Sequence, residues 1–445
     1  MARSLGSNLL VRFSPNPQKP EFLYLLNHFL GIIAPMSVME LSAPAWIASP
    51  SALQQLADEL LRYPSIAVDT ESNSLHAYRE QLCLIQFSTP ETDFLVDPLE
   101  FDDLSTLAPI FGYPDLEKVF HAAEYDLICL KRSFGITVTN LFDTMQAASI
   151  LGYKQVGLDS MLAEKLGVIV NKKYQKADWG ERPLSPEMLN YARLDTHHLL
   201  DLRDCLQAEL QKNNRWDLAC EEFIRLAQCN GVSKAIIPSW QRVKDTQKFT
   251  KQQLAIFQEL CTWRDTQAER MDRPVFKVID DKRLVAIALA APRTHKDLTA
   301  LQLTPRQIDA YGNNLLQAVE RGRKTDPISR PRTSRPKQAI TDRLTALSTW
   351  RKSVAQKIGI ESDLVLPKGW MHAIAEQNPS NIAELSALMP QSPWRLENFG
   401  AGILKAIHTK PTGSPVGGIS CRWAISGRWA RCLSTSRCLQ SVCRA

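Results

Sequence analysis

Four carboxylates constrain the fold of this 445-residue chain more than any other feature, because each interrupts a segment that otherwise has the pattern of a strand or a helix. They are Asp69, Glu71, Asp126 and Asp195. An ionised carboxylate buried without a partner is costly, so a fold that buries several of them must neutralise their charge. Divalent cations can do this. The pattern therefore predicts that the fold brings the three segments into one pocket, where bound cations would assist cleavage of a phosphodiester.

The first two acids follow a predicted strand. Residues 66–68 form a short apolar and partly β-branched run after a Tyr-Pro pair, which is typical of a strand. Side chains two residues apart on a strand lie on the same face. We therefore expect Asp69 and Glu71 to point together at the carboxyl end of this strand.

The other two acids are predicted on helices. Residues 118–121 have the pattern of a strand that leads into a helix, and Asp126 falls in the first turn of that helix. Residues 186–210 have helical periodicity. Tyr191 and Asp195 lie four residues apart in this stretch, so the spacing places them on one face of the predicted helix.

Oxygen ligands from strand and helix ends suit hard cations such as Mg²⁺ or Mn²⁺. Two such ions, about 3.5–4 Å apart, can activate an attacking water and stabilise the leaving oxygen. Taken alone, each acid has a simpler explanation: Asp126 as a helix N-terminal acid favoured by the dipole, and Asp195 as a solvated helix residue. Taken together, in this order and local context, the acids favour a metal site.

The three segments resemble the exonuclease motifs of the DEDD 3′–5′ exonucleases, and Tyr191, four residues before the last Asp, resembles their Tyr subclass. Within that group, residues 46–210 resemble ribonuclease D. The segments that carry the resemblance are VDTES, LCLIQFST, FLVDP, VFHAAEYDL, NLFDTMQAASILGY and YARLDTHHL. The resemblance implies an RNase H-like α/β exonuclease domain with a mixed sheet.

The resemblance also implies roles for the site residues. The four acids would be the ligands of two Mg²⁺ or Mn²⁺ ions. Tyr191 would orient the nucleophilic water, and Glu71 would also lie near the 3′-terminal hydroxyl of the substrate.

A lysine-rich stretch, residues 171–179, lies just before the predicted catalytic helix and mixes cations with aromatic side chains. Its members are Lys172, Lys173, Tyr174, Lys176 and Trp179. Such a loop can contact phosphates and stack on bases. A solvated loop with a buried Trp is an equally good interpretation of the sequence.

Three further polar residues have structural explanations that compete with a functional one. Asp143 ends a predicted strand before a helix, and we favour a helix cap over a role in the site. His121 could touch the substrate, although a core histidine with satisfied hydrogen bonds is slightly favoured. Gln86 has apolar neighbours and is predicted to be a hydrogen-bonded residue of the sheet.

The C-terminal half contains an internal repeat. A shift of 87 residues superimposes Leu260, Trp263 and Arg264 on Leu347, Trp350 and Arg351, together with several other apolar positions. This register predicts two copies of one helical module, in which the Trp and Leu positions are core. The first copy resembles the HRDC (helicase-and-ribonuclease-D C-terminal) domain, and the second keeps the same pattern in a more diverged form.

These patterns predict an α/β exonuclease domain followed by two all-α helical bundles. The predicted boundaries are an N-terminal extension at 1–42 that reflects disorder or an upstream start assignment, an exonuclease domain at 43–212, a connecting segment at 213–248, a first HRDC domain at 249–324, a basic linker at 325–340, a second HRDC-like domain at 341–409 and an irregular basic, Cys-containing tail at 410–445.

The net charge of +6 is not evidence for nucleic-acid binding, because residues 410–445 carry six basic residues and no acid. Any electrostatic binding of RNA must therefore come from local clusters of basic residues. Four of the ten cysteines lie in this tail with spacings that fit no compact zinc pair, and the other six are scattered as in reduced cytosolic proteins. The apolar run before residue 35 is too short and interrupted to span a bilayer. We therefore expect a cytoplasmic protein.

The resemblance implies a metal-dependent 3′–5′ exoribonuclease that releases 5′-mononucleotides. Its expected substrates are RNAs with a single-stranded 3′ end, notably tRNA precursors and other structured RNAs. No obligate protein partner is predicted. A DNA exonuclease of the same superfamily remains an alternative, because the carboxylates do not read the sugar 2′-hydroxyl. A catalytically inactive nucleic-acid-binding adaptor is a second alternative, against which the intact acids and Tyr191 argue.

Overall fold

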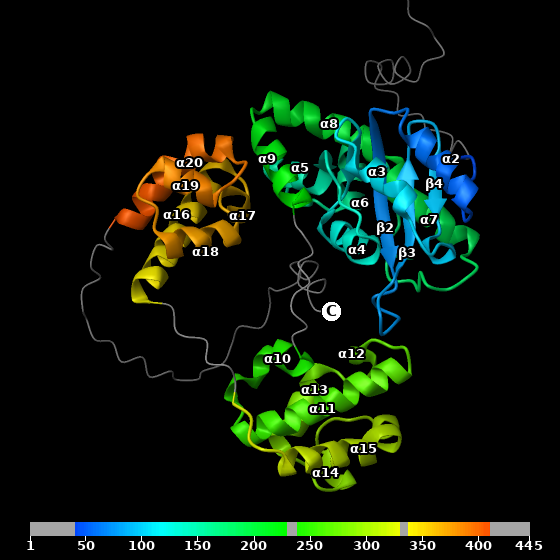
Figure 1. The fold of residues 1–445 in the computed structure, drawn as a ribbon, viewed down its shortest axis with the longest axis vertical. Helices are drawn as coiled ribbons and strands as arrows, with labels where there is room; N and C mark the ends of the chain where they lie inside the picture. Colours follow the sequence, from blue (N-terminus) through cyan, green and yellow to red (C-terminus); the bar gives the residue numbers. More distant parts are fainter. Residues whose placement is uncertain (1–40, 229–237, 330–336, 410–445) are drawn as a thin grey trace, which may run out of the picture. The chain divides into compact units, whose positions relative to one another are not determined.

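A computed structural model describes residues 41–228, 238–329 and 337–409 of the chain (Figure 1). Residues 1–40 of the predicted N-terminal extension, residues 330–336 of the predicted linker and the predicted tail at 410–445 lie outside the described residues. All the elements below belong to one compact unit that begins at Pro44. None of the described helices is both long enough and apolar enough to cross a membrane.

The exonuclease domain is built on a six-stranded sheet in the order β1-β4-β3-β2-β5-β6. The strands are β1 (Ala45–Ile47), β2 (Ser65–Ser72), β3 (Leu82–Ser88), β4 (Asp93–Val96), β5 (Glu117–Phe120) and β6 (Leu141–Asp143). Strand β3 pairs antiparallel with β2 and β4, whereas β5 pairs parallel with β2 and β6. The predicted mixed α/β sheet is therefore confirmed.

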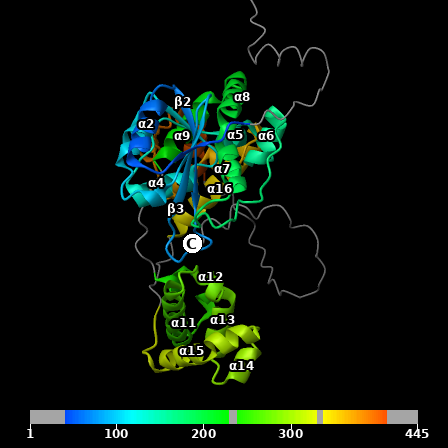
Figure 2. The same cartoon turned by 90° about the vertical axis from the view of Figure 1, so that its right-hand side faces the viewer.

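Helices cover both faces of this sheet (Figures 1 and 2). Every residue of β3 is buried, as expected for a central strand between two helical layers. One layer, with α2, α3 and α4, shares an apolar core with Ile66, Val68 and Phe87. The helices of the domain are α2 (Pro50–Leu60), α3 (Ala108–Gly112), α4 (Glu124–Phe134), α5 (Thr144–Leu151), α6 (Leu158–Leu166), α7 (Pro186–His197), α8 (Leu199–Lys212) and α9 (Trp216–Ala227), with short 3₁₀ turns at Pro98–Glu100 and Ser105–Leu107.

The predicted helix over residues 186–210 is two helices that meet at His198. Helix α7 contacts β3, β4 and β2, whereas α8 contacts β2 and β5. The break lets α8 bury one leucine per turn, at positions 199, 202, 206 and 210. The sequence therefore predicted one helix where the structure has two, because the apolar period continues across His198.

The two predicted helical modules are present as two sets of five helices, and each helix of the first set has its counterpart about 87 residues later. The first set is α11 (Lys251–Arg270), α12 (Val275–Val278), α13 (Asp281–Ala290), α14 (His295–Thr299) and α15 (Pro305–Lys324). The second is α16 (Gln338–Ile358), α17 (Ser362–Val365), α18 (Lys368–Gln377), α19 (Ile382–Leu388) and α20 (Pro393–His408). A short α10 (Ser239–Arg242) and a 3₁₀ turn (Lys244–Lys248) precede the first set.

The repeated arginine has the same role in both modules. The Arg264 guanidinium donates to the backbone carbonyl of Ile279 at 3.0 Å, and that of Arg351 donates to the carbonyl of Leu366 at 2.9 Å. Each arginine therefore ties the first long helix of its module to the segment before the third helix.

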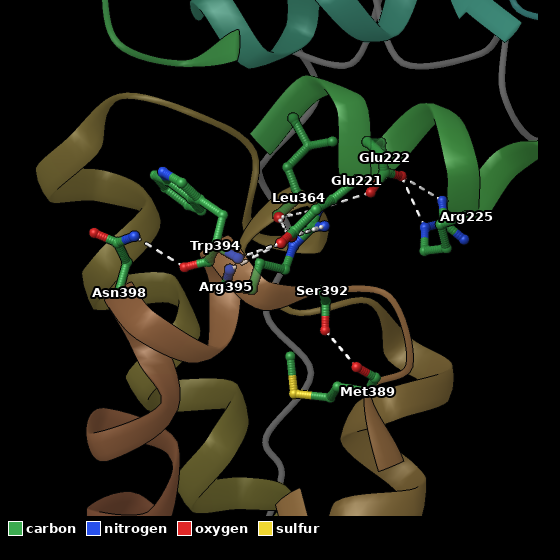
Figure 3. A network of polar contacts seen from close by, with 9 residues as sticks. All are labelled: Glu221, Glu222, Arg225, Leu364, Met389, Ser392, Trp394, Arg395 and Asn398. Atoms are coloured by element: carbon green, nitrogen blue, oxygen red, sulfur yellow. Dashed lines mark hydrogen bonds and ion pairs between the residues drawn. The ribbon is translucent and has the colours of Figure 1, made fainter. Parts of the chain in front are cut away.

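Helix α9, within the predicted connecting segment, packs on the exonuclease domain and also contacts α20. Its Phe223 ring lies 4.8 Å from the Phe142 ring of β6. On the other side, Arg395 of α20 is completely buried and forms ion pairs with Glu221 at 3.1 Å and Glu222 at 2.7 Å (Figure 3). Glu221 also accepts a hydrogen bond from the backbone N–H of Arg395 at 3.2 Å and so caps the first turn of α20. The second module is therefore joined to α9 by buried charges.

Candidate active site

Three of the predicted acids meet on one face of the sheet. Asp69 and Glu71 lie two residues apart on β2, on the face that α7 covers, and Asp195 comes from α7 itself. One carboxylate oxygen of each lies within 4.8 Å of the others. We call Asp69, Glu71 and Asp195 the acid cluster.

Asp126 lies beside the acid cluster, in the first turn of α4 as predicted. Its carboxylate accepts a hydrogen bond from the hydroxyl of Thr70, which is the residue between the two acids of β2. The start of α4 is held in turn by Asp143, whose carboxylate accepts from the backbone N–H of Ala123 at 2.8 Å. Asp143 also caps α5 through the N–H of Gln146 at 2.9 Å, so the predicted cap is confirmed and this side chain joins the starts of two helices.

A buried carboxylate on β4 holds α7 in place. Asp93 contacts His197 Nδ1 at 2.9 Å and Arg193 Nε at 3.7 Å, both on α7. It also accepts from the hydroxyl of Ser88 at 2.7 Å, and that hydroxyl lies 2.7 Å from the hydroxyl of Thr196. We call these five residues the α7 clamp. Because three of them lie on α7, the clamp fixes the rotation of the helix and with it the direction of Tyr191 and Asp195.

The acids have raised pKa values, as carboxyls do when burial and neighbouring acids disfavour ionisation. Burial raises the pKa of Asp126 and of Asp195 to about 7. The pKa values of Asp69 and Glu71 lie well above their usual range, first because of burial and then because of the charges of the neighbouring acids. The donor set consists only of carboxylate oxygens, which fits a hard divalent cation such as Mg²⁺ or Mn²⁺.

Tyr191 lies one turn before Asp195 on α7, and its ring contacts two other aromatic rings. The centroid of Tyr174 is 5.9 Å away, edge-on, and that of Trp179 is 6.1 Å away. Burial raises the pKa of the Tyr191 phenol above its ordinary value. The phenol therefore keeps its proton at neutral pH and is a hydrogen-bond donor beside the acids.

The lysine-rich loop is only partly directed at this site. Tyr174 contacts Tyr191, and the Lys173 ammonium lies 4.8 Å above the Tyr174 ring. Lys172 forms an ion pair with Asp159 at the start of α6, at 2.8 Å. Lys176 is exposed, and its backbone carbonyl lies 3.0 Å from the ring nitrogen Nε2 of His76. Trp179 is buried, as the structural interpretation of this loop predicted.

The other predicted candidates are placed as follows. His121 is half-buried, with Nδ1 2.8 Å from the hydroxyl of Thr144, and burial lowers its pKa to about 4. His121 is therefore neutral at pH 7. Gln86 was predicted to be hydrogen-bonded within the sheet, but its side-chain amide has no partner among the described residues.

Sequence reasoning missed Asp93 and Thr70. Asp93 lies in a polar loop-like stretch, and its importance depends on a helix more than 100 residues away. Thr70 lies between Asp69 and Glu71, and the sequence indicated a role only for these two acids. A β-strand places alternate residues on opposite faces, and this was the signal that could have assigned Thr70 to the α4 side.

Comparisons with known proteins agree with this arrangement. The family described as 3′-5′ exonuclease matches residues 44–211, and the HRDC domain family matches residues 253–319 and 341–407. The chain is 28% identical over 368 residues to ribonuclease D of Nitrobacter hamburgensis, a match that covers 81% of this chain and 94% of the relative. It is 34% identical to human exosome complex component 10, but spans only 33% of that relative's length, with 63% of this chain covered.

A solved structure is similar over nearly its full length. The crystal structure of Escherichia coli RNase D, described as an exoribonuclease involved in structured RNA processing, matches with a TM-score of 0.61 and 25% identity. The match covers 82% of this chain and 98% of the solved chain.

Proposed function

The chain is a ribonuclease D-like DEDD 3′–5′ exonuclease with two HRDC domains, and we propose that it trims the 3′ ends of tRNA precursors and other structured RNAs, releasing 5′-mononucleotides. The observation that carries this proposal is the convergence of Asp69, Glu71 and Asp195 within 4.8 Å, with Asp126 and Tyr191 beside them. The five cysteines of the described residues are unpaired, which supports action in the cytoplasm.

Asp69, Glu71, Asp126 and Asp195 would hold two divalent cations, Mg²⁺ or Mn²⁺. The raised pKa values support this, because they reflect burial and mutual repulsion that disfavour the ionised acids, and bound cations would neutralise that charge while their binding releases the protons. When bound, the cations would supply positive charge that activates the attacking water and stabilises the leaving oxygen.

The protein's own part in the reaction is to orient the reactants. Tyr191 keeps its phenolic proton at neutral pH, so it can donate a hydrogen bond to the attacking water from a fixed position on α7. The α7 clamp holds that position. Glu71 would lie near the 3′-terminal hydroxyl, where only the last nucleotide of a strand can be placed.

The lysine-rich loop would bind the end of the RNA. Tyr174 lies against Tyr191 and offers a ring on which a base can stack, and Lys173 and Lys176 are exposed cations for the backbone phosphates. Lys172 is held by Asp159, so it would contribute less to binding. His121 would contact the substrate only as a neutral hydrogen-bonding group.

The proposal is tested by digesting an RNA that has a duplex stem and a single-stranded 3′ tail, with Mg²⁺, with Mn²⁺ or with EDTA. The predicted products are 5′-mononucleotides in the two cation reactions and none in EDTA. Oligonucleotide products, or release that continues in EDTA, would contradict the proposal. Asp69→Asn should be inactive, whereas Asp201→Asn, an exposed acid on α8, should act like the wild type.

A DNA of the same sequence separates the proposal from its enzymatic alternative. Carboxylates that hold cations do not read the sugar 2′-hydroxyl, so the relative rates of digestion of RNA and DNA decide between the two enzymes. Preference for RNA supports the proposal, and equal or faster digestion of DNA favours the DNA exonuclease. Tight RNA binding without any cleavage would favour the inactive adaptor.

A further inference from the structure

Gln86, in the middle of β3, has a buried side-chain amide that nothing in the described structure satisfies. Its side chain is 0% exposed, and neither its oxygen nor its nitrogen has a hydrogen-bond partner. Buried polar groups in native proteins nearly always have a partner, because an unsatisfied one costs stability. The amide therefore needs an explanation.

The Gln86 side chain faces α7 and the acid cluster. Its neighbours on the same face of β3 are Leu84, which shares an apolar cluster with Ala192 of α7, and Ser88, which bonds to Thr196 of α7. Across the sheet, Gln86 pairs directly with Asp69 in the antiparallel register. Directly opposed residues lie on the same face, with Cβ atoms about 5 Å apart. The unsatisfied amide is thus next to the first acid of the cluster.

Other acceptors described on this face are already bonded, and the buried indole N–H of Trp179, which also lacks a partner among the described residues, is a donor that cannot accept from the amide N–H. On β4, Gln86 pairs with Leu95, which is buried and apolar. The hydroxyls of Ser88 and Thr196 bond to each other, and Ser88 also donates to Asp93. The acid cluster offers carboxylate acceptors that the α7 clamp does not use, and Asp69 is the residue directly opposite Gln86 on β2.

We propose that Gln86 is a positioning residue for the cation site, and that its amide N–H donates to the Asp69 carboxylate when a divalent cation is bound there. This inference rests on the proposed cation-dependent function. An amide suits the task because it can orient a carboxylate without bringing a positive charge, which would compete with the cation. Such outer hydrogen bonds fix metal-binding side chains, and their loss commonly weakens metal binding tenfold or more.

Gln86→Met tests the proposal, because it keeps the length of the side chain and removes the amide. Binding of Mn²⁺ is measured by calorimetry on the full chain, alongside thermal unfolding in EDTA. We expect Mn²⁺ to bind about tenfold more weakly to the variant, with cleavage slowed at low Mn²⁺ and restored by excess Mn²⁺. In EDTA the melting temperature should stay the same or rise, since the unsatisfied amide is gone.

Phe87→Leu is the matched control. Phe87 is the next residue of β3, is equally buried and faces the opposite core. We expect it to lower the melting temperature and to leave Mn²⁺ affinity unchanged. If Gln86→Met behaves like this control, Gln86 is only structural and the inference is wrong.

Two further results keep the test decisive. If wild-type protein does not bind Mn²⁺, the proposed function itself fails, whereas normal binding in both proteins overturns only the role of Gln86. If Gln86→Met does not fold, a crystal structure of the wild type with Mn²⁺ decides. The amide nitrogen within about 3.2 Å of an Asp69 oxygen supports the inference, and an amide directed at any other group refutes it.

Discussion

Removing one charge from the acid cluster should stabilise the protein in the absence of cations while it abolishes cleavage. Asp195→Asn is the suitable change, because it preserves shape and removes only the charge. At the 4.8 Å that bounds the oxygens of the cluster, two unit charges interact by about 3.5 kcal/mol at an effective dielectric of about 20. Burial independently raises the pKa of Asp195 to about 7, about three units above the usual value.

Solvent and shared protons reduce both effects, because Asp195 is partly exposed and the acids are not all ionised at once. Discounted for solvent screening, these effects correspond to a gain of about 1–3 kcal/mol in the free energy of unfolding at pH 8. The assay is urea unfolding in EDTA, with Asp201→Asn as the control for loss of an exposed acid. A variant that is less stable than the wild type in EDTA would show that cationic groups of the protein already neutralise Asp195, and would refute the reasoning.

Three more predictions follow from the site and its supports. The folded-state pKa values of the site acids are raised, so without cations the native site holds more protons than the unfolded chain and loses this stabilising contribution as the pH rises through about 7; the difference in free energy of unfolding between saturating Mg²⁺ and EDTA should therefore grow from about pH 4 to above pH 7 in urea titrations. Arg395→Ala leaves Glu221 buried without its ion-pair partner and leaves Glu222 paired only with Arg225, so it should cost about 3–5 kcal/mol in unfolding experiments, whereas Arg62→Ala, which breaks an exposed pair, should cost less than about 1 kcal/mol. Asp93→Asn loosens the α7 clamp and should lower kcat about tenfold with little change in KM, and an unchanged kcat would exclude a positioning role for Asp93.

The sequence was sufficient to predict those parts of the site that depend on local periodicity. The two-residue spacing of Asp69 and Glu71 on a strand determines their shared face, and the four-residue spacing of Tyr191 and Asp195 does the same on a helix. The 87-residue repeat predicted the two helical modules down to the equivalent arginines, Arg264 and Arg351. In each case the information lies within a few turns of one element or in a comparison of the chain with itself.

What the sequence could not show depends on contacts between distant segments. The α7 clamp joins residues of β3 and β4 to a helix about a hundred positions later, and Arg395 reaches glutamates 173 and 174 residues away. The break at His198 could not be predicted, because the buried positions of both helices follow one helical period. Gln86 was predicted to be satisfied within the sheet, and only the pairing register reveals that its amide lies opposite Asp69 without a partner.

The proposed function requires the acid cluster to be a cation-dependent site for removing the 3′-terminal nucleotide. The most direct measurement is the single-turnover rate at which wild-type protein and Asp69→Asn shorten a 5′-labelled RNA as Mg²⁺ is titrated. We predict that the wild type shortens the RNA by one nucleotide at a time from the 3′ end, with a rate that rises and saturates with Mg²⁺, and that the variant stays at the EDTA background at every concentration. A variant that keeps the wild-type rate and Mg²⁺ dependence would contradict the account.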